Sequence, residues 1–513
     1  MKIVHVSFLI LFFNTQLIAQ NIVALDANNA NVMLADFGAF CFNPNGAAGY
    51  EIPKNSGNHA LYTMQFRIAG KDEGGNIKIA SSNAFSTTDF TAGPISNNYS
   101  SAYYTNTFDT CIWKVTRDQI NYHVANYTAV GYTADASIAK WPGNGNPTEG
   151  VTAQLAPYVD VNGDQVYNPS DGDFPYIQGD AATFVIMNDA AAPHQLTLGS
   201  AFGVEIHFMF YQFETTDEIN NTTFLSTKIF NRSDTNYTDL YFGFYLDFDL
   251  GNSNNDYVGS DSIRSLAYVY NGESTDDGQG GQPGYGNNPP AFGFKMLNAP
   301  AGSIYGYEVG GAGLPGVLTG DDNYMFMQGL LANGDPLMYA PYPTKFVFTG
   351  NPFLGTGWNE FTAGNIDGDR RMFISSESNN LQSADNLCFD YAFIFNQEAG
   401  NALGNANSLL NTADFVQNYY DNAIYQCNEI FLETVDQNAP LELSIFPNPS
   451  HGNFKVQISK PASISIYSVT SDLVMQEFEL TESRDLNLNL ESGIYFVHIK
   501  SGDETRTKKI IIY

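Results

Sequence analysis

Short apolar runs of strand length dominate this chain between residues 60 and 395, and polar turn sequences separate many of them. Runs of this length that are rich in Phe, Tyr, Val and Ile favour β-strands, whereas helices need longer segments with apolar residues three or four apart. The pattern therefore predicts a mainly β fold. The predicted strands are Ala60–Ile68, Thr183–Met187, Val204–Phe213, Thr223–Phe230, Leu240–Leu246, Leu266–Tyr270, Lys345–Thr349 and Phe389–Phe395.

Only two segments show helical periodicity. Thr116–Tyr127 and Ala406–Tyr425 both place apolar residues at spacings of three and four, which predicts one apolar face on each helix. We expect residues 21–436 to form one or two β-sandwich-like domains with a few helices, and a second domain would begin near residues 180–200. The glycine-rich stretch Asn271–Pro290 is typical of a long flexible loop.

The composition is acidic and aromatic. The net charge is −32, yet only 15% of the residues are charged, and the chain holds 38 Phe and 31 Tyr. Aromatic side chains favour strands, and this content is too apolar for a disordered chain. Nucleic-acid binding depends on Lys and Arg at phosphates, so this charge argues against a nucleic-acid partner. It is compatible with bound divalent cations.

The first twenty residues have the parts of a secretory signal peptide. Lys2 supplies a positive start, Val6–Phe13 is almost wholly apolar, and Ala19 offers a small residue near a cleavage site. The run is too short for a membrane-spanning helix, and no other segment approaches the roughly 20 apolar residues that one requires. We therefore expect export of the chain, with residues 1–20 removed and no transmembrane segment.

The C-terminal residues carry a specific series of motifs. Short alternating strands follow a turn-rich start, and the chain closes on a basic and then apolar run. This pattern resembles the type A C-terminal sorting domain of proteins that the type IX secretion system of Bacteroidetes exports. The resemblance implies a small immunoglobulin-like β-sandwich over residues 442–513, after a linker at 437–441, and the secretion machinery as a partner. The motifs are Phe446-Pro447-Asn448-Pro449, Gly452-Asn453-Phe454, Ser492-Gly493-Ile494-Tyr495-Phe496-Val497-His498-Ile499 and Thr507-Lys508-Lys509-Ile510-Ile511-Ile512-Tyr513.

Several motifs of the preceding residues, taken in order, resemble those of a group of secreted Bacteroidetes proteins that end in the same kind of tail. The resemblance supports a secreted or outer-surface location, and it implies no reaction. The motifs are Tyr50-Glu51-Ile52-Pro53-Lys54, Ile112-Trp113-Lys114-Val115, Trp141-Pro142-Gly143-Asn144-Gly145, Asp247-Phe248-Asp249-Leu250-Gly251 and Gly368-Asp369-Arg370-Arg371.

The chain has four cysteines: Cys41, Cys111, Cys388 and Cys427. An exported protein with an even number of cysteines can form disulfides, here in three possible pairings. A chain of this length can also fold without them, so buried free thiols are an equal alternative. The spacing leaves the pairing open.

The strongest local motif is a twelve-residue segment with oxygen ligands at calcium-loop spacing. It resembles the calcium loops of dockerins, which implies a structural Ca²⁺. Gln165 stands at position six, where glycine is usual, and Pro169 disfavours a standard following helix, while Asp173 offers a further carboxylate. A solvated turn without an ion is the alternative. The predicted ligands are Asp160, Asn162, Asp164, the carbonyl of Val166, and Asp171.

A second acidic group consists of Asp247, Asp249, Asp256 and Asp261. Asp247 and Asp249 end a predicted strand two residues apart, so both side chains point to one face. Like charges in that arrangement repel each other unless a cation or an arginine lies between them. The sequence leaves three interpretations open: a second calcium site, a glycosidase-like pair of carboxylates, and an exposed acidic turn.

No zinc-protease, nucleophile-elbow or phosphate-loop motif is present in the sequence. Cys388 and His194 could form a nucleophile and base, but no neighbouring sequence supports that pair. We therefore expect a non-enzymatic surface protein, either structural or adhesive, or one that binds a glycan or protein. The alternative is an extracellular hydrolase, glycosidase- or protease-like, whose active site is assembled from distant carboxylates.

Overall fold

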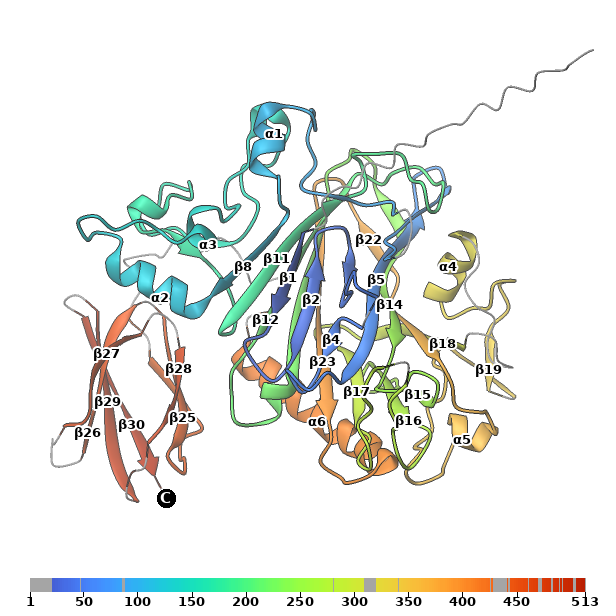
Figure 1. Cartoon of the computed structure of the whole chain (residues 1–513). Coiled ribbons are helices and arrows are strands. Elements are labelled where there is room, and N and C mark those ends of the chain that lie inside the picture. Colours follow the sequence, from blue (N-terminus) through green and yellow to red (C-terminus); the bar gives the residue numbers. More distant parts are fainter. Residues whose placement is uncertain are drawn as a thin grey trace, which may run out of the picture. The chain divides into compact units, whose positions relative to one another are not determined.

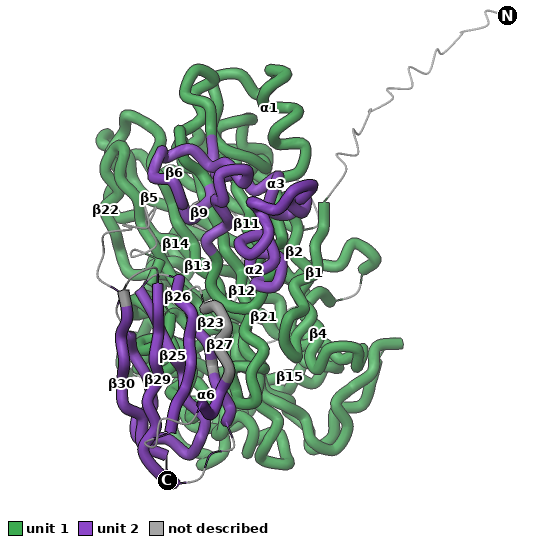
Figure 2. The backbone as a smooth tube through the Cα atoms, turned by 90° about the vertical axis from the view of Figure 1, so that its left-hand side faces the viewer, with its two compact units in different colours: residues 1–116, 145–155, 177–429 green, residues 117–144, 156–176, 430–513 purple. Residues whose placement is uncertain are grey.

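The computed structural model describes residues 21–513 apart from 47, 85–87, 280, 309–319, 340, 425, 428–440, 442, 460, 469–472, 481–482, 489, 491, 502–503 and 513. The expected signal peptide (1–20) and the linker residues 437–440 lie outside the described residues. The chain forms two compact units (Figure 2). The first comprises Met1–Thr116, Gly145–Leu155 and Ile177–Glu429, and the second comprises Arg117–Asn144, Ala156–Tyr176 and Ile430–Tyr513.

Two large antiparallel sheets make up the first unit (Figure 1). In the first sheet, β4 (Tyr50–Glu51), β6 (Ile77–Ser81) and β22 (Asn379–Leu381) pair beside the main path. That path runs in the order β1 (Ile22–Leu25), β2 (Asn31–Ala35), β3 (Ala39–Phe40), β5 (His59–Lys71), β14 (Tyr237–Phe248), β21 (Arg370–Ser376) and β18 (Ala301–Glu308).

In the second sheet, β8 (Ile112–Thr116) pairs with β11 beside the main path. That path runs in the order β15 (Asp256–Asp261), β16 (Leu266–Asn271), β17 (Ala291–Met296), β23 (Asn386–Asn396), β13 (Thr222–Asn231), β12 (Val204–Gln212), β11 (Ala181–Asn188) and β7 (Thr91–Ala92).

The two sheets pack face to face through alternate aromatic and aliphatic side chains. On β14, Leu240, Phe242, Phe244, Leu246 and Phe248 are all fully buried, as the period of two in a strand requires. Rings of the two sheets meet across the core: the centroids of Phe66 and Phe208 lie 4.8 Å apart, and those of Phe244 and Phe294 lie 5.4 Å apart. Each such pair adds roughly 0.5–1.5 kcal/mol beyond the burial of its area. One sandwich therefore accounts for the first unit.

Helix α6 (Ala402–Ala423) packs against β16, β17 and β23 of the second sheet. The Asn401 side chain caps its first turn by accepting a hydrogen bond from the amide of Gly404 at 2.9 Å. The other helices of this unit are short: α1 (Ala102–Thr107), α4 (Gly320–Met327), α5 (Glu360–Ala363), and the 3₁₀ segments η1 (Pro147–Glu149) and η3 (Glu218–Asn221). A small hairpin consists of β19 (Leu337–Tyr339) and β20 (Tyr342–Thr344).

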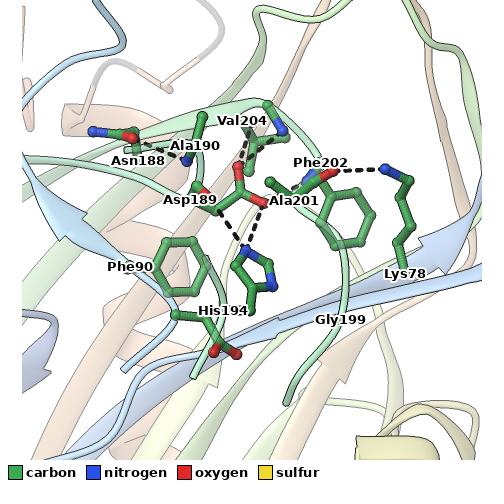
Figure 3. A network of polar contacts seen from close by, with 12 residues as sticks. Lys78, Phe90, Asn188, Asp189, Ala190, His194, Gly199, Ala201, Phe202 and Val204 are labelled. Carbon is green, nitrogen blue, oxygen red and sulfur yellow. Dashed lines mark hydrogen bonds and ion pairs between the residues drawn. The ribbon is translucent and has the colours of Figure 1, made fainter. Parts of the chain in front are cut away.

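A buried polar network secures the connection between β11 and β12 (Figure 3). The Asp189 carboxylate accepts hydrogen bonds from the amides of Phe202 (2.6 Å), Gly203 (2.9 Å) and Val204 (2.9 Å). The ring nitrogens of His194 face the carbonyls of Ile79 at 3.2 Å and Asp189 at 3.1 Å. Although burial lowers it, the pKa of His194 is raised by the hydrogen bond and charge of Asp189. The network thus favours a charged imidazolium with a structural role.

The second unit contains three separate segments of the chain, of which the first two form one small region. This region includes α2 (Arg117–Asn126), α3 (Ala136–Ala139), the 3₁₀ segment η2 (Pro169–Asp171), and a short pair of strands, β9 (Tyr158–Val159) and β10 (Phe174–Pro175). The Tyr167 hydroxyl donates to the carbonyl of Ile138 at 2.6 Å, and the Trp141 indole donates to that of Pro157 at 2.9 Å. Buried aromatic side chains with satisfied polar tips therefore hold this small region.

The C-terminal residues form a two-sheet sandwich around their own core, which confirms the predicted small β-domain. Leu441, from the expected linker, is fully buried in this core together with Phe454 and Val456. One sheet consists of β24 (Leu443–Phe446), β25 (Asn453–Ile458) and β28 (Ser483–Asn487). The other consists of β27 (Leu473–Leu480), β26 (Ala462–Ser468), β29 (Gly493–Ser501) and β30 (Glu504–Ile512).

The mainly β fold class is confirmed, and so are both helices, as α2 and α6. Lys345–Thr349 is not a strand: within it, Phe346 makes only an isolated bridge to Ile304. Near 180–200, residues 181–188 form β11, and residues 189–203 connect it to β12, its partner in the same sheet. Within the described part of the chain, no helix combines the length and apolarity that crossing a membrane requires.

Candidate functional site

Three carboxylates gather where β14 ends and β21 begins. Asp247 is the penultimate residue of β14, Asp249 follows the strand, and Asp369 precedes β21. One ligand oxygen of each lies within 4.8 Å of those of the other two. The antiparallel register brings them together, because it pairs Asp247 with Arg371. We call Asp247, Asp249 and Asp369 the acidic cluster.

Arg371 is the cation beside this cluster. Its Nε lies 2.9 Å from Oδ1 of Asp247, and its Nη2 lies 3.0 Å from Oδ2 of Asp369. Burial and the neighbouring Asp369 charge raise the pKa of Asp247 to about 7, although Arg371 opposes the shift. Burial and the charges of Asp247 and Asp369 raise the pKa of Asp249 to about 8. A single guanidinium therefore does not offset the cost of holding three carboxylates together.

Asp256 and Asp276 close the turn beside the cluster. Asp256 begins β15, is fully buried, and accepts a hydrogen bond on Oδ2 from the amide of Leu250 at 3.2 Å. Asp276 accepts from the amides of Asn252 at 3.0 Å and Tyr285 at 2.7 Å. Burial raises the pKa of both carboxyl groups. The glycine-rich stretch that was predicted to be a flexible loop is thus tied down by a buried acid.

Glycine is required at position 251 in this turn. Its φ is +72°, and a Cβ added there would lie 1.8 Å from Oδ2 of Asp276. No larger residue fits between the backbone and that carboxylate. The close contact between the backbone of Gly251 and the Asp276 carboxylate therefore holds the turn in place.

Asp261, the fourth member of the predicted second site, lies at the opposite end of β15 from Asp256. Its Oδ1 accepts hydrogen bonds from the amides of Ile263 and Arg264, each at 3.0 Å, and its Oδ2 pairs with Nη1 of Arg264 at 2.7 Å. The structure thus brings Asp247 and Asp249 together with Asp369, places Asp256 next to them, and leaves Asp261 in its own ion pair.

The predicted calcium loop is curled around Asp160. Its Oδ1 accepts from the amide of Gly163 and its Oδ2 from that of Gln165, both at 2.7 Å. Asn162 accepts from the amide of Asp164 at 3.0 Å, and Asp164 accepts from that of Val166 at 2.8 Å. The side chains at positions one, three and five therefore organise the loop's backbone.

Gln165, at position six of the loop, adopts the left-handed backbone conformation for which glycine is usual. Its φ is +64°, in the left-handed region, so the turn at position six forms without glycine. Pro169 begins a single 3₁₀ turn, within which Asp171 accepts from Nδ2 of Asn168 at 2.6 Å. Asp173 is fully buried and accepts from the amides of Val161 and Asn168, each at 2.8 Å. Asp173 thus closes the loop.

The structure excludes Cys388 as a nucleophile paired with His194, because its sulfur is in a disulfide bond. Cys388 forms a disulfide with Cys427, 39 residues away, while Cys41 and Cys111 are buried free thiols. Burial raises the pKa of both free thiols, which suppresses the thiolate form. The four cysteines, whose pairing the sequence left open, therefore form one disulfide and leave two buried free thiols.

The comparisons with known proteins differ in strength. A polysaccharide lyase structure aligns with 70% of this chain at 8% identity and a TM-score of 0.21, and the chain spans 37% of the lyase's length. A provisionally assigned aldose 1-epimerase from Escherichia coli K12 aligns with 74% of this chain and 99% of its own, at 9% identity and a TM-score of 0.24. At such TM-scores neither likeness carries an argument. No curated protein matches the chain.

The C-terminal domain is the part that a family model matches. Residues 444–513 match the secretion system C-terminal sorting domain. They form the two-sheet sandwich described above, with the buried core of Phe454, Val456 and Ile464. The chain therefore carries a type IX sorting domain, which directs it to the cell surface or the extracellular space and engages the type IX secretion machinery.

Proposed function

We propose that this protein is a calcium-stabilised structural or adhesive component of the cell exterior, or one that binds an extracellular glycan or protein there. The sorting domain supplies the location. The observation that carries the calcium part is the loop around Asp160, in which side-chain oxygens at positions one, three and five hold a tightly curled backbone. Calcium prefers such hard oxygen ligands, and a curled loop presents several of them at once.

The small size of the region around the loop explains why an ion would matter there. Only short elements surround the loop, and its connections to them include the pair between Asn144 and Tyr167, whose amide donates to Oδ1 of Asn144 at 2.8 Å. The buried Asp173 adds a negative charge close to Asp160 and Asp164, and burial together with those charges raises its pKa. A divalent cation would offset this repulsion and fix the loop.

Calcium is expected to raise the melting temperature of the purified chain, and Asp160→Ala with Asp164→Ala is expected to reduce that gain. At a calcium concentration 100-fold above Kd, a bound ion stabilises its site by about 2.7 kcal/mol. Calorimetric titration and thermal unfolding in calcium and in EDTA measure the effect. Asp118→Ala, which removes an exposed acid of the same unit, should leave it unchanged. An unaltered response of the double variant would contradict calcium binding by this loop.

Export of the chain is expected to depend on the sorting domain. Deleting residues 441–513 removes the whole C-terminal sandwich and should trap the remaining chain in the periplasm, because the outer-membrane step then lacks its signal. Immunoblots of periplasmic, surface and medium fractions measure this, with the undeleted chain as control. Surface or medium accumulation of the truncated chain would contradict the role of the domain.

The hydrolase alternative rests on the raised pKa of Asp247 and Asp249, because a carboxyl group that stays protonated near neutral pH can act as a general acid. The spacing is less favourable: glycosidase carboxyl groups lie roughly 5–9.5 Å apart, whereas ligand oxygens of the cluster lie within 4.8 Å of one another and Arg371 contacts two of the three groups. A glycan array together with a polysaccharide and peptide hydrolysis screen separates the two functions. Turnover that Asp249→Asn abolishes would favour the hydrolase.

A further inference from the structure

We propose that the acidic cluster of Asp247, Asp249 and Asp369 binds one calcium ion between the end of β14 and the start of β21. This site lies in the first compact unit and the Asp160 loop lies in the second, so the proposal is independent of the calcium loop. Asp369 is separated from Asp249 by more than a hundred residues, and only the pairing of β14 with β21 makes the set complete.

The charges of the cluster are incompletely matched. Arg371 contacts Asp247 and Asp369, and the described residues show no hydrogen bond or ion pair to the Asp249 carboxylate. Three carboxylates beside one guanidinium leave two negative charges when all are ionised. A divalent cation supplies the charge that the neighbouring side chains do not.

A buried oxygen within the cluster, and another on the neighbouring Asp256, indicate a missing partner. Oδ1 of Asp369 and Oδ1 of Asp256 are both inaccessible and have no hydrogen-bond partner among the described residues. Such atoms are rare in native proteins, and a bound ion or water molecule can supply the missing partner. Asp369 directs its other oxygen to Arg371, so its Oδ1 remains for a cation.

Asp256 lies between the two segments that carry the cluster. Its Oδ2 accepts from the amide of Leu250, which follows Asp249, and its carbonyl accepts from the amide of Gly368, which precedes Asp369, at 3.0 Å. Asp256 is fully buried. Asp256 therefore holds together the two segments that carry the cluster, while the ligand group itself consists of Asp247, Asp249 and Asp369.

The donors identify the class of cation. All are carboxylate oxygens, which suit calcium and magnesium better than zinc or copper. Calcium takes about six to eight oxygen ligands in flexible geometry, whereas magnesium demands a near-ideal octahedron and keeps several of its water molecules. The cluster is an irregular set of carboxylates from the ends of two strands, which suits calcium better than magnesium.

The test uses the full chain with Asp160→Ala and Asp164→Ala, which removes the loop as a calcium ligand. Calorimetric titration with calcium chloride after EDTA treatment should still show one bound ion per chain. Adding Asp249→Asn should weaken that binding at least about tenfold, the minimum loss that even outer-shell changes at metal sites produce. Asp249→Asn keeps the side chain's size and breaks no ion pair, and circular dichroism verifies that the variant is folded.

The matched control is Asp239→Asn, an exposed acid near the other end of β14 that pairs with Lys71 at 2.9 Å. It removes the same charge from the same strand and should leave calcium affinity unchanged. Equal affinity with and without Asp249→Asn would overturn the proposal, and so would a loop variant that binds no calcium. Magnesium binding as tight as calcium binding would overturn the choice of ion.

Discussion

Replacing Glu360 by alanine is expected to destabilise the first unit by about 3–5 kcal/mol, the loss that follows when one partner of a buried ion pair is removed. Glu360 and Arg370 are 1% and 2% exposed. Nε of Arg370 donates to Oε1 of Glu360, and Nη2 donates to Oε2, both at 2.9 Å. Oε1 also accepts from the amide of Val258 at 2.9 Å. Truncation would remove the carboxylate that neutralises the buried guanidinium and accepts from the Val258 amide, although Nη2 of Arg370 keeps its hydrogen bond to the carbonyl of Ile366.

The matched control is the exposed pair of Lys71 and Asp239, whose side chains are 38% and 51% exposed and 2.9 Å apart. Asp239→Asn, which suits the left-handed backbone of this position, should change stability far less, because solvent screens a surface pair. Denaturant unfolding followed by fluorescence and circular dichroism compares the two variants. Equal losses of unfolding free energy at the buried and the exposed pair would contradict the argument that burial makes the Glu360–Arg370 pair costly to break. Glu360→Gln, which retains an acceptor for Val258, should fall between wild type and Glu360→Ala.

Removing the disulfide between Cys388 and Cys427 is expected to destabilise the first unit by about 4 kcal/mol. A cross-link that closes a loop of 39 residues lowers the entropy of the unfolded chain, and this loss raises the free energy of the unfolded state by about that amount. The fold around it should survive, because Asp390 also holds this segment: it accepts from the Tyr420 hydroxyl at 2.6 Å and from the Cys427 amide at 2.9 Å.

Differential scanning calorimetry of Cys388→Ser with Cys427→Ser, with and without a reductant, measures the effect. The reductant should lower the melting temperature of the wild type and leave that of the double variant unchanged. The other two cysteines are buried free thiols, so they supply no second reducible bond in the described structure. A double variant that melts with the wild type would contradict the stabilising role of the bond.

Much of the fold could be predicted because its signals are local. Strands such as β12 and β23 carry apolar residues at strand length, and α6 carries them at helical spacing. Lys345–Thr349 shows the limit of that argument: its apolar pattern is real, but only Phe346 makes a bridge, so no strand forms. An apolar run becomes a strand only where a neighbour offers a ladder of hydrogen bonds.

The acidic cluster could be predicted only in part. Asp247 and Asp249 are neighbours in sequence, so their shared face was visible from the strand period. Asp369 and Arg371 join them through a cross-strand register that no local pattern encodes. Asp261 was grouped with them because it is close in sequence, yet the length of β15 carries it to the other end of the strand.

The sequence by itself determined the sorting domain, the mainly β fold and the spacing of oxygen-bearing side chains around Asp160, because each depends on the order of residues within a short segment. Tertiary structure alone decided that Cys388 pairs with Cys427, that Asp369 completes the acidic cluster beside Arg371, and that Asp276 ties down a glycine-rich loop. The physical reason is that charge pairing, thiol pairing and burial depend on distances in space. Those distances are set by tertiary contacts: strand pairing brings Asp369 and Arg371 to Asp247 from more than a hundred positions away, and the disulfide joins residues 39 positions apart.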